Sequence, residues 1–132
     1  MAQSKGWNLD EWVVPSGRIR GARTNVSDSA TPTIDSLLSN RYFLSTAQAG
    51  ITLQVPTNRP TTSSQAQGFL LTIFCNTTTT TLDADTATSQ GFKYSAAVPS
   101  LPTLSSGQYI DIWCEYNFTI SRWVFEGYNV YS

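Results

Sequence analysis

The chain has 132 residues, a formal charge of −1 and no histidine. This length suits a single domain, and the near-neutral charge gives no electrostatic reason to expect binding to nucleic acid or to a membrane surface. Only 13% of the residues are charged, about half of the usual share. No apolar run approaches the roughly 18 residues of a membrane span, and no signal peptide is recognisable at the N-terminus, so we expect synthesis and retention in a cytoplasm.

Residues 1–30 differ in composition from the rest of the chain. They show no helical period and contain few residues that could form a core, so we expect an extended N-terminal arm and linker. Aromatic side chains and arginine often anchor interfaces, and this favours a partner contact through the arm. The alternative is that the arm folds back as an edge strand on its own domain. The candidate partner-binding residues are Trp7, Trp12, Arg18, Arg20 and Arg23.

Strand signals become regular after residue 31. The segments 33–38, 41–47, 50–56, 68–75, 81–85 and 92–95 are short, rich in β-branched and aromatic residues, and separated by turn-forming residues. The segment 68–75 is a nearly continuous apolar run, which predicts a strand buried on both faces. The weakest of the six signals is that of 33–38.

The segments 108–117 and 122–131 predict a closing β-hairpin, because a short connection joins them. The first segment alternates with a period of two, so Ile110, Ile112 and Cys114 share one face and Trp113 lies on the other. If Ile110, Ile112 and Cys114 face the core, an exposed aromatic surface can form from Trp113, Tyr128 and Tyr131. Such a surface suits a protein interface or the stacking of sugars; the alternative is that both faces are covered and Trp113 belongs to the core.

About seven or eight short strands with regular turn signals predict an all-β fold. We expect an antiparallel β-sandwich or barrel over residues 31–132, and no helix of ordinary length.

The residue types give no indication of catalysis, a cofactor or a metal site. Without histidine, the commonest general base and metal ligand is missing. Asp83 and Asp85 are better explained as turn caps than as calcium ligands, because further acidic ligands are absent nearby. Cys75 and Cys114 are expected to be buried free thiols. Asp111 and Glu115 would lie roughly 13 Å apart on one strand, which does not suit a glycosidase pair.

Several motifs follow one another in the second part of the chain. They are ATPTID at 30–35, RYFLST at 41–46, AGITLQVP at 49–56, LTIFCN at 71–76, LP at 101–102 and GQYIDIWCEYN at 107–117, followed by RW at 122–123. Their order resembles that of small β-sandwich domains in the virion proteins of tailed bacteriophages. The resemblance covers about three quarters of the chain and includes no catalytic motif. It implies a fold similar to a jelly roll, often in a homotrimer.

Two virion roles are compatible with this resemblance. In the first, the chain is a decoration or cement protein on the surface of the phage head, and the arm bridges major capsid subunits or contacts another virion protein. In the second, it is a tail-fibre or tail-tip domain that binds a host surface glycan, with exposed aromatic residues such as Trp113 stacking on sugars. The short chain favours the first role. Both roles are non-enzymatic, and both place a protein made in the host cytoplasm in the virion.

Overall fold

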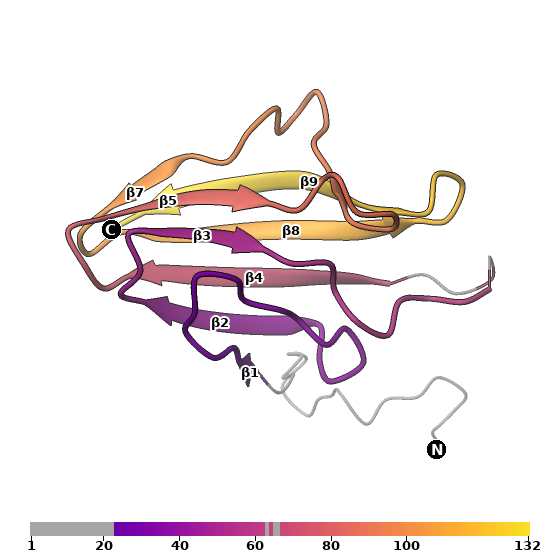
Figure 1. The fold of residues 1–132 in the computed structure, drawn as a ribbon, viewed down its shortest axis with the longest axis horizontal. Helices are drawn as coiled ribbons and strands as arrows, with labels where there is room; N and C mark the ends of the chain where they lie inside the picture. Colours follow the sequence, from indigo (N-terminus) through magenta and orange to yellow (C-terminus); the bar gives the residue numbers. More distant parts are fainter. Residues whose placement is uncertain (1–22, 63, 65–66) are drawn as a thin grey trace, which may run out of the picture.

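The computed structural model describes residues 23–62, 64 and 67–132, and within these ranges the fold is all-β without a helix. Figure 1 shows long strands lying side by side, with shorter strands in front of or beside them. The strands are β1 (Thr24–Asn25), β2 (Arg41–Thr46), β3 (Gly50–Leu53), β4 (Gly68–Cys75), β5 (Thr79–Ala84), β6 (Phe92–Lys93), β7 (Thr103–Ser105), β8 (Tyr109–Asn117) and β9 (Arg122–Tyr131).

The strands form two mixed sheets. The larger sheet has the order β1-β2-β4-β8-β9-β6, and the smaller has the order β3-β5-β7. From β2 to β5 the chain alternates between the sheets, so successive strands of one sheet run in the same direction. For this reason β2 pairs with β4, and β3 with β5, in parallel. The pairs β4–β8, β5–β7 and β8–β9 are antiparallel.

The expectation of a purely antiparallel sandwich is therefore wrong. Local periodicity identifies a strand but not the sheet that it joins, and the alternation of the chain between sheets makes some pairs parallel. A jelly roll consists of antiparallel Greek keys, so the parallel pairs β1–β2, β2–β4, β3–β5 and β6–β9 count against that part of the expectation.

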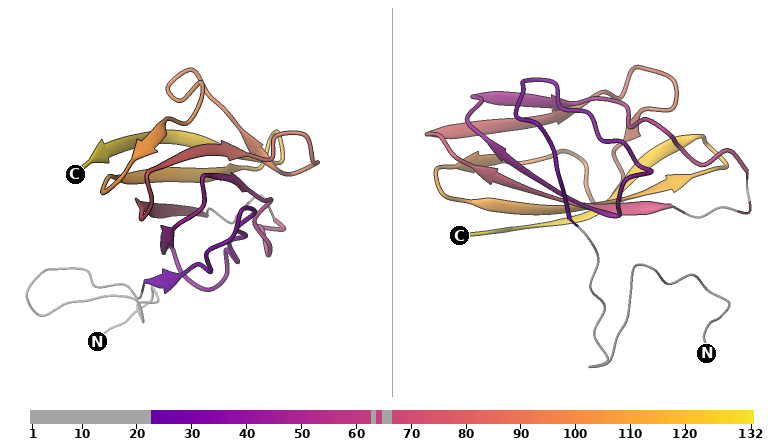
Figure 2. Two further views of the ribbon diagram at one scale, coloured as in Figure 1. Left: turned by 60° about the vertical axis from the view of Figure 1, so that its left-hand side comes forward. Right: turned by 90° about the horizontal axis from the view of Figure 1, so that it is seen from below.

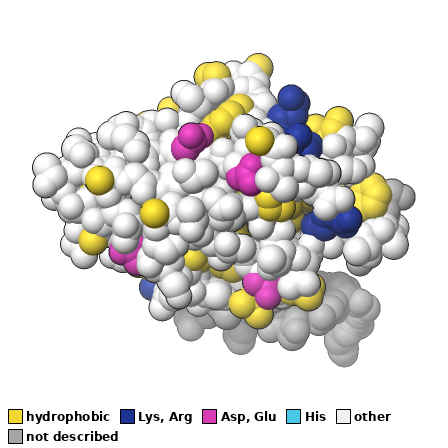
Figure 3. Space-filling model, in the orientation of Figure 1, with side chains coloured by type: hydrophobic (Ala, Val, Ile, Leu, Met, Phe, Trp, Pro, Cys, Tyr) yellow, Lys and Arg dark blue, Asp and Glu magenta, His cyan; other side chains and the backbone are white. Residues whose placement is uncertain are grey.

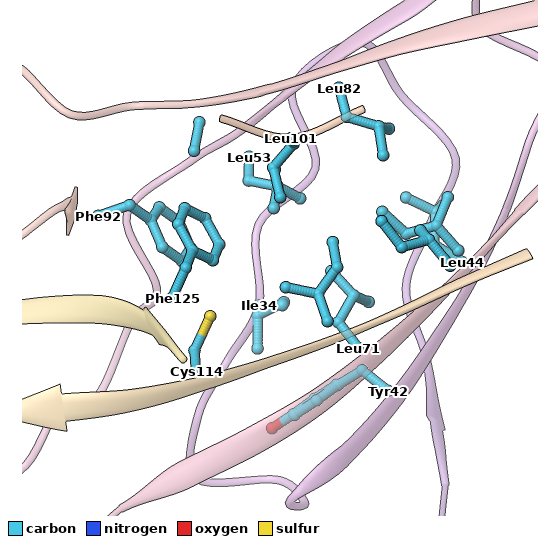
Figure 4. Packing of buried hydrophobic residues seen from close by; sticks show 14 of the residues in the cluster. Ile34, Tyr42, Leu44, Leu53, Leu71, Leu82, Phe92, Leu101, Cys114 and Phe125 are labelled. Atoms are coloured by element: carbon cyan, nitrogen blue, oxygen red, sulfur yellow. The ribbon is translucent and has the colours of Figure 1, made fainter. Parts of the chain in front are cut away.

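One hydrophobic core is shared by the two sheets. Alternate residues along β2, β4 and β8 are buried, and so are Trp123 and Phe125 in the first half of β9, Ile51 and Leu53 of β3 and Leu104 of β7. Figure 4 shows Phe92 and Phe125 stacked beside Leu53 and Leu101, with Leu44, Leu71 and Tyr42 further along the same layer. The period of two in the sequence thus divides each long strand between the core and an outer face.

The structure agrees with some of the predicted strands and differs from others. The ranges of β4 and β9 agree with the prediction, although the outward residues of β4 are half-buried rather than fully covered. The segment 33–38 is wrong as a strand: it turns, Leu37 and Leu38 are exposed, and one isolated bridge joins Asp35 to Thr57. The short strand β7 was not anticipated, and β1 corresponds to the alternative in which the N-terminal arm folds back as an edge strand.

Residues 24–30, which were expected in the arm, lie against the domain. Asn25 lies next to Phe43 in the parallel β1–β2 pair, and the Val26 amide donates to the Phe43 carbonyl at 2.8 Å. The Asp28 carboxylate accepts hydrogen bonds from Thr46 Oγ1 at 2.7 Å and from the amide that follows it. The additional views in Figure 2 show β1 at the margin of the larger sheet. The described end of the expected arm is thus an edge of the sandwich.

Tyr94 connects the two sheets. Its ring stacks on Phe125 of β9 at 5.2 Å, and its hydroxyl donates to Asp83 Oδ1 of β5 at 3.0 Å. Burial of the ring, together with the hydrogen bond to Asp83, raises the pKa of Tyr94 to about 12. Only the protonated hydroxyl can donate this bond, so the neutral form of Tyr94 is the form that the fold stabilises.

This pKa shift predicts a loss of stability at alkaline pH. Because folding raises the pKa of Tyr94 from 10.0 to about 12, its contribution is complete below pH 10 and is lost as the pH rises through about 12. Urea unfolding at pH 8 and pH 11 should show a smaller fall in the free energy of unfolding for Tyr94→Phe than for the native chain. An equal fall in the two proteins would contradict this role; a residual fall is expected because the pKa of Tyr42 is also raised, mainly by burial.

Candidate functional site

The candidate site is the outer face of the larger sheet, opposite the core. Residues directly opposite each other in neighbouring strands project to the same side, so the registers define this face. It includes Phe43 of β2, Leu70, Thr72 and Phe74 of β4, Tyr109, Asp111 and Trp113 of β8, and Asn129 and Tyr131 of β9. The exposed residues Arg41 and Ser45 of β2 and Glu115 of β8 lie on the same face. None of these side chains is among the fully buried ones, and Trp113 and Tyr131 are 43% and 40% exposed.

Three aromatic rings form a row across the central strands at one end of this face. Phe74 pairs with Tyr109, and Tyr109 pairs with Tyr131. The ring centroids are 4.6 Å apart in the first pair and 5.3 Å in the second, where the planes are within 7° of parallel. The Tyr109 and Tyr131 rings are stacked, so each covers one face of the other. We refer to Phe74, Tyr109 and Tyr131 as the aromatic row.

A carboxylate lies beside the aromatic row. Asp111 Oδ1 accepts a hydrogen bond from Thr72 Oγ1 at 2.6 Å and another from the Tyr131 hydroxyl at 3.1 Å. Partial desolvation, followed by this contact with Asp111, raises the pKa of Tyr131. The two donors hold the carboxylate in place, and they orient the Tyr131 hydroxyl toward the centre of the face.

Trp113 lies over a glycine of the neighbouring strand. It pairs with Gly127 of β9, and a Cβ atom at Gly127 would come within 2.8 to 3.0 Å of three indole atoms. One side of the indole therefore packs against the β9 backbone, while the side chain is 43% exposed. The absence of a side chain at Gly127 is what allows the ring to approach the sheet so closely.

An arginine reaches the far margin of the same face. The guanidinium carbon of Arg23 lies 4.4 Å from the centroid of the Phe43 ring, which is the geometry of a cation–π contact. Arg23 directly precedes β1, so the N-terminal segment enters the described structure beside this outer face.

The structure brings together only some of the residues proposed from the sequence. Trp113 and Tyr131 share the outer face, and Arg23 contacts its margin. Tyr128 is 38% exposed, but it pairs with Ile112 and is therefore on the core side of the sheet. The remaining candidates, Trp7, Trp12, Arg18 and Arg20, lie outside the described residues.

Sequence reasoning missed most residues of this face. Phe74 was assigned to a strand buried on both faces, and Phe43 was not singled out. Tyr109 could have been found, because it continues the alternation of Asp111 and Trp113 along β8. The signal for Phe74 was weaker, since its neighbours in β4 are also apolar.

The described residues show no arrangement suited to metal binding or nucleophilic chemistry. No group of three or more potential metal-ligating side chains occurs among them. Asp85 caps a turn as expected, accepting hydrogen bonds from the Ala87 and Thr88 amides and the Thr88 hydroxyl, and the bonds from Thr88 are the largest cause of its lowered pKa. This part of the chain also contains no apolar helix of membrane-spanning length.

Both cysteines are buried free thiols, as expected. Cys114 pairs with Phe69, six residues before Cys75 on β4, so the two thiols are about 20 Å apart along the strands. Burial, with a smaller contribution from Glu126, raises the pKa of Cys114 well above its usual value. Its thiol thus lacks the depressed pKa that marks a reactive cysteine.

Comparisons of the chain with protein-family models, with curated proteins and with solved structures find no match.

Proposed function

We propose that this chain is a non-enzymatic structural protein of a phage virion, and that it decorates the head by binding a capsid subunit through the outer face of its larger sheet. The observation that carries the proposal is the part of this face where the aromatic row and Trp113 lie on either side of the hydrogen-bonded carboxylate of Asp111. Aromatic residues are enriched and charged residues depleted at the centres of protein interfaces. The virion setting rests on the resemblance described from the motifs.

The orientation of the rings favours a protein partner over a sugar. Sugars stack on the faces of aromatic rings, but within the row Tyr109 and Tyr131 each cover one face of the other. Ring edges and hydroxyl groups can pack into a complementary protein surface. The low share of charged residues is compatible with a protein partner. In the view of Figure 3, Lys, Arg, Asp and Glu side chains occupy only a small part of the surface.

The alternative role is binding of a host glycan by a tail protein, and the indole of Trp113 is the specific observation in its favour. One side of this ring packs on Gly127, so the other side is available for stacking on a sugar. The two roles predict different positions in the virion, head for the first and tail for the second.

Immunogold labelling of intact particles separates the two roles. A serum against this protein should label the head surface if the chain decorates the capsid. Label confined to the tail would overturn the proposal and would favour the glycan-binding role.

The contact face is tested with particles that lack the protein. A charged residue in the interface centre would be desolvated without a partner, so Tyr109→Glu and Trp113→Glu should each weaken binding to these particles at least about tenfold. Thr103→Glu is the matched control, because Thr103 is an exposed residue of β7 in the other sheet. Circular dichroism would verify that each variant is folded. Full binding by both face variants would contradict the proposed interface.

Deletion of residues 1–22 tests the other candidate anchor. This truncation removes Trp7, Trp12, Arg18 and Arg20 and retains every described strand. If the outer face is the main contact, the truncated protein should still bind the particles. Complete loss of binding, with the domain still folded, would assign the anchor to the arm instead.

A further inference from the structure

Within the described part of the chain, the second half of β9 has an open edge. β6 pairs with β9 only at Trp123 and Val124, and the Ser95 hydroxyl donates to the Phe125 carbonyl at 2.7 Å. Beyond Phe125, no strand of the described residues pairs with β9 on the side away from β8. An unpaired strand edge presents backbone donors and acceptors to other chains.

The hydrogen-bond alternation identifies which backbone groups face this edge. The Tyr116 amide donates to Gln67, on the β4 side of β8, and the Trp123 amide donates to Gly91, on the open side of β9. Antiparallel pairs alternate between bonded and non-bonded residues, and the register shifts once, between Trp113 and Cys114. Tyr116 and Trp123, which lie opposite each other, therefore form a non-bonded pair. When the alternation is continued past the register shift, Tyr128 and Val130 are also in non-bonded pairs with β8 and direct their N–H and C=O groups away from it.

Features that usually protect a strand edge from pairing with another chain are scarce in the part of β9 that follows the register shift. Residues 127–132 contain no charged side chain and no proline, although lysine, proline and inward charges are the common means of blocking edge pairing. The register shift leaves Glu126 as the extra residue of β9, and it lies before the open segment. Two copies of this segment can therefore pair without placing charged side chains of residues 127–132 opposite each other.

We propose that this edge is a self-association surface, at which β9 of one copy pairs antiparallel with β9 of a second copy around a two-fold axis at Asn129. In this register Tyr128 of each copy pairs with Val130 of the other, and the outward N–H and C=O groups form four hydrogen bonds. Tyr opposite Val is a favourable cross-strand pair. The edge is thus complementary to itself, as a two-fold interface requires.

The pairing also extends the outer face. Gly127 of one copy would lie opposite Tyr131 of the other, so that Tyr131 of the second copy is next to the Trp113 indole over Gly127. The aromatic rows of the two copies then belong to one continuous sheet face. The inference does not depend on the proposed virion role, because it is tested on the isolated protein. It replaces the three-fold assembly expected from the resemblance by a two-fold one.

Light scattering at micromolar concentration gives the first test. The mass should be twice the 14.5 kDa of the chain. A monomeric or a trimeric mass for the native protein would overturn the proposal.

A charge exchange at Asn129 tests the register. The two copies of this exposed residue directly oppose each other on the axis, so Asn129→Lys alone and Asn129→Asp alone should each weaken dimerisation at least about tenfold by like-charge repulsion. An equimolar mixture of the two variants should regain the dimeric mass, since Lys then faces Asp. Thr103→Lys on the other sheet should remain dimeric. If the mixture stays monomeric while both variants are folded, the two-fold register at Asn129 is wrong.

Discussion

Replacement of Trp123 by alanine is expected to lower the free energy of unfolding by about 3 to 5 kcal/mol. Trp123 is fully buried, and its ring centroid is 5.3 Å from that of Phe69 and 5.1 Å from that of Tyr116. Removal of the indole would leave a cavity between β4, β8 and β9, which these rings line. Urea unfolding should show a lower midpoint with an unchanged slope.

Trp113 provides a matched control in the same hairpin. Its side chain is 43% exposed, so Trp113→Ala should cost about 1 kcal/mol or less. Equal losses for the two variants would contradict the assignment of Trp123 to the core and Trp113 to the surface. Trp123→Phe should cost less than Trp123→Ala, partly because the Trp123 Nε1–H group has no hydrogen-bond partner among the described residues, and an unpaired buried donor is unfavourable.

Gly91→Ala is the second substitution with a large expected effect. A Cβ atom at this position would lie 2.5 Å from the Asp85 carbonyl oxygen and 2.9 Å from that of Thr88. Both are backbone atoms, held in place because the Gly91 amide donates to Thr88 and the Phe92 amide donates to Asp85. The loop must shift to admit the methyl group, and we expect a loss of about 1 to 3 kcal/mol. Thermal unfolding followed by circular dichroism would measure it.

Gly127→Ala is the comparison for this loop. Its new methyl group would also be crowded, at 2.8 Å, but the atom that it meets belongs to the exposed Trp113 indole. This side chain can rotate away, so the loss should be smaller than for Gly91→Ala. A larger loss at Gly127 would show that the indole is more rigidly held than its exposure suggests.

Local patterns in the sequence determined the fold class and most of the strands. The apolar run of β4 and the aromatic and β-branched run of β9 are each bounded by turn residues, and both were found with their correct ends. The alternation of β8 placed Ile110 and Ile112 on one face and Trp113 on the other, and the structure buries the first two and leaves Trp113 43% exposed. These features depend on neighbouring residues only, which is why the sequence alone predicts them.

Only the tertiary structure decided the pairing of strands and the composition of the outer face. The chain alternates between the two sheets, and this makes β2 and β4 parallel. The register shift in β9 reverses the sides of the residues that follow it, so Tyr131 joins the aromatic row while Tyr128 lies on the core side. Which side a residue occupies after such a shift depends on its partner in β8, and the local sequence of β9 does not contain that information.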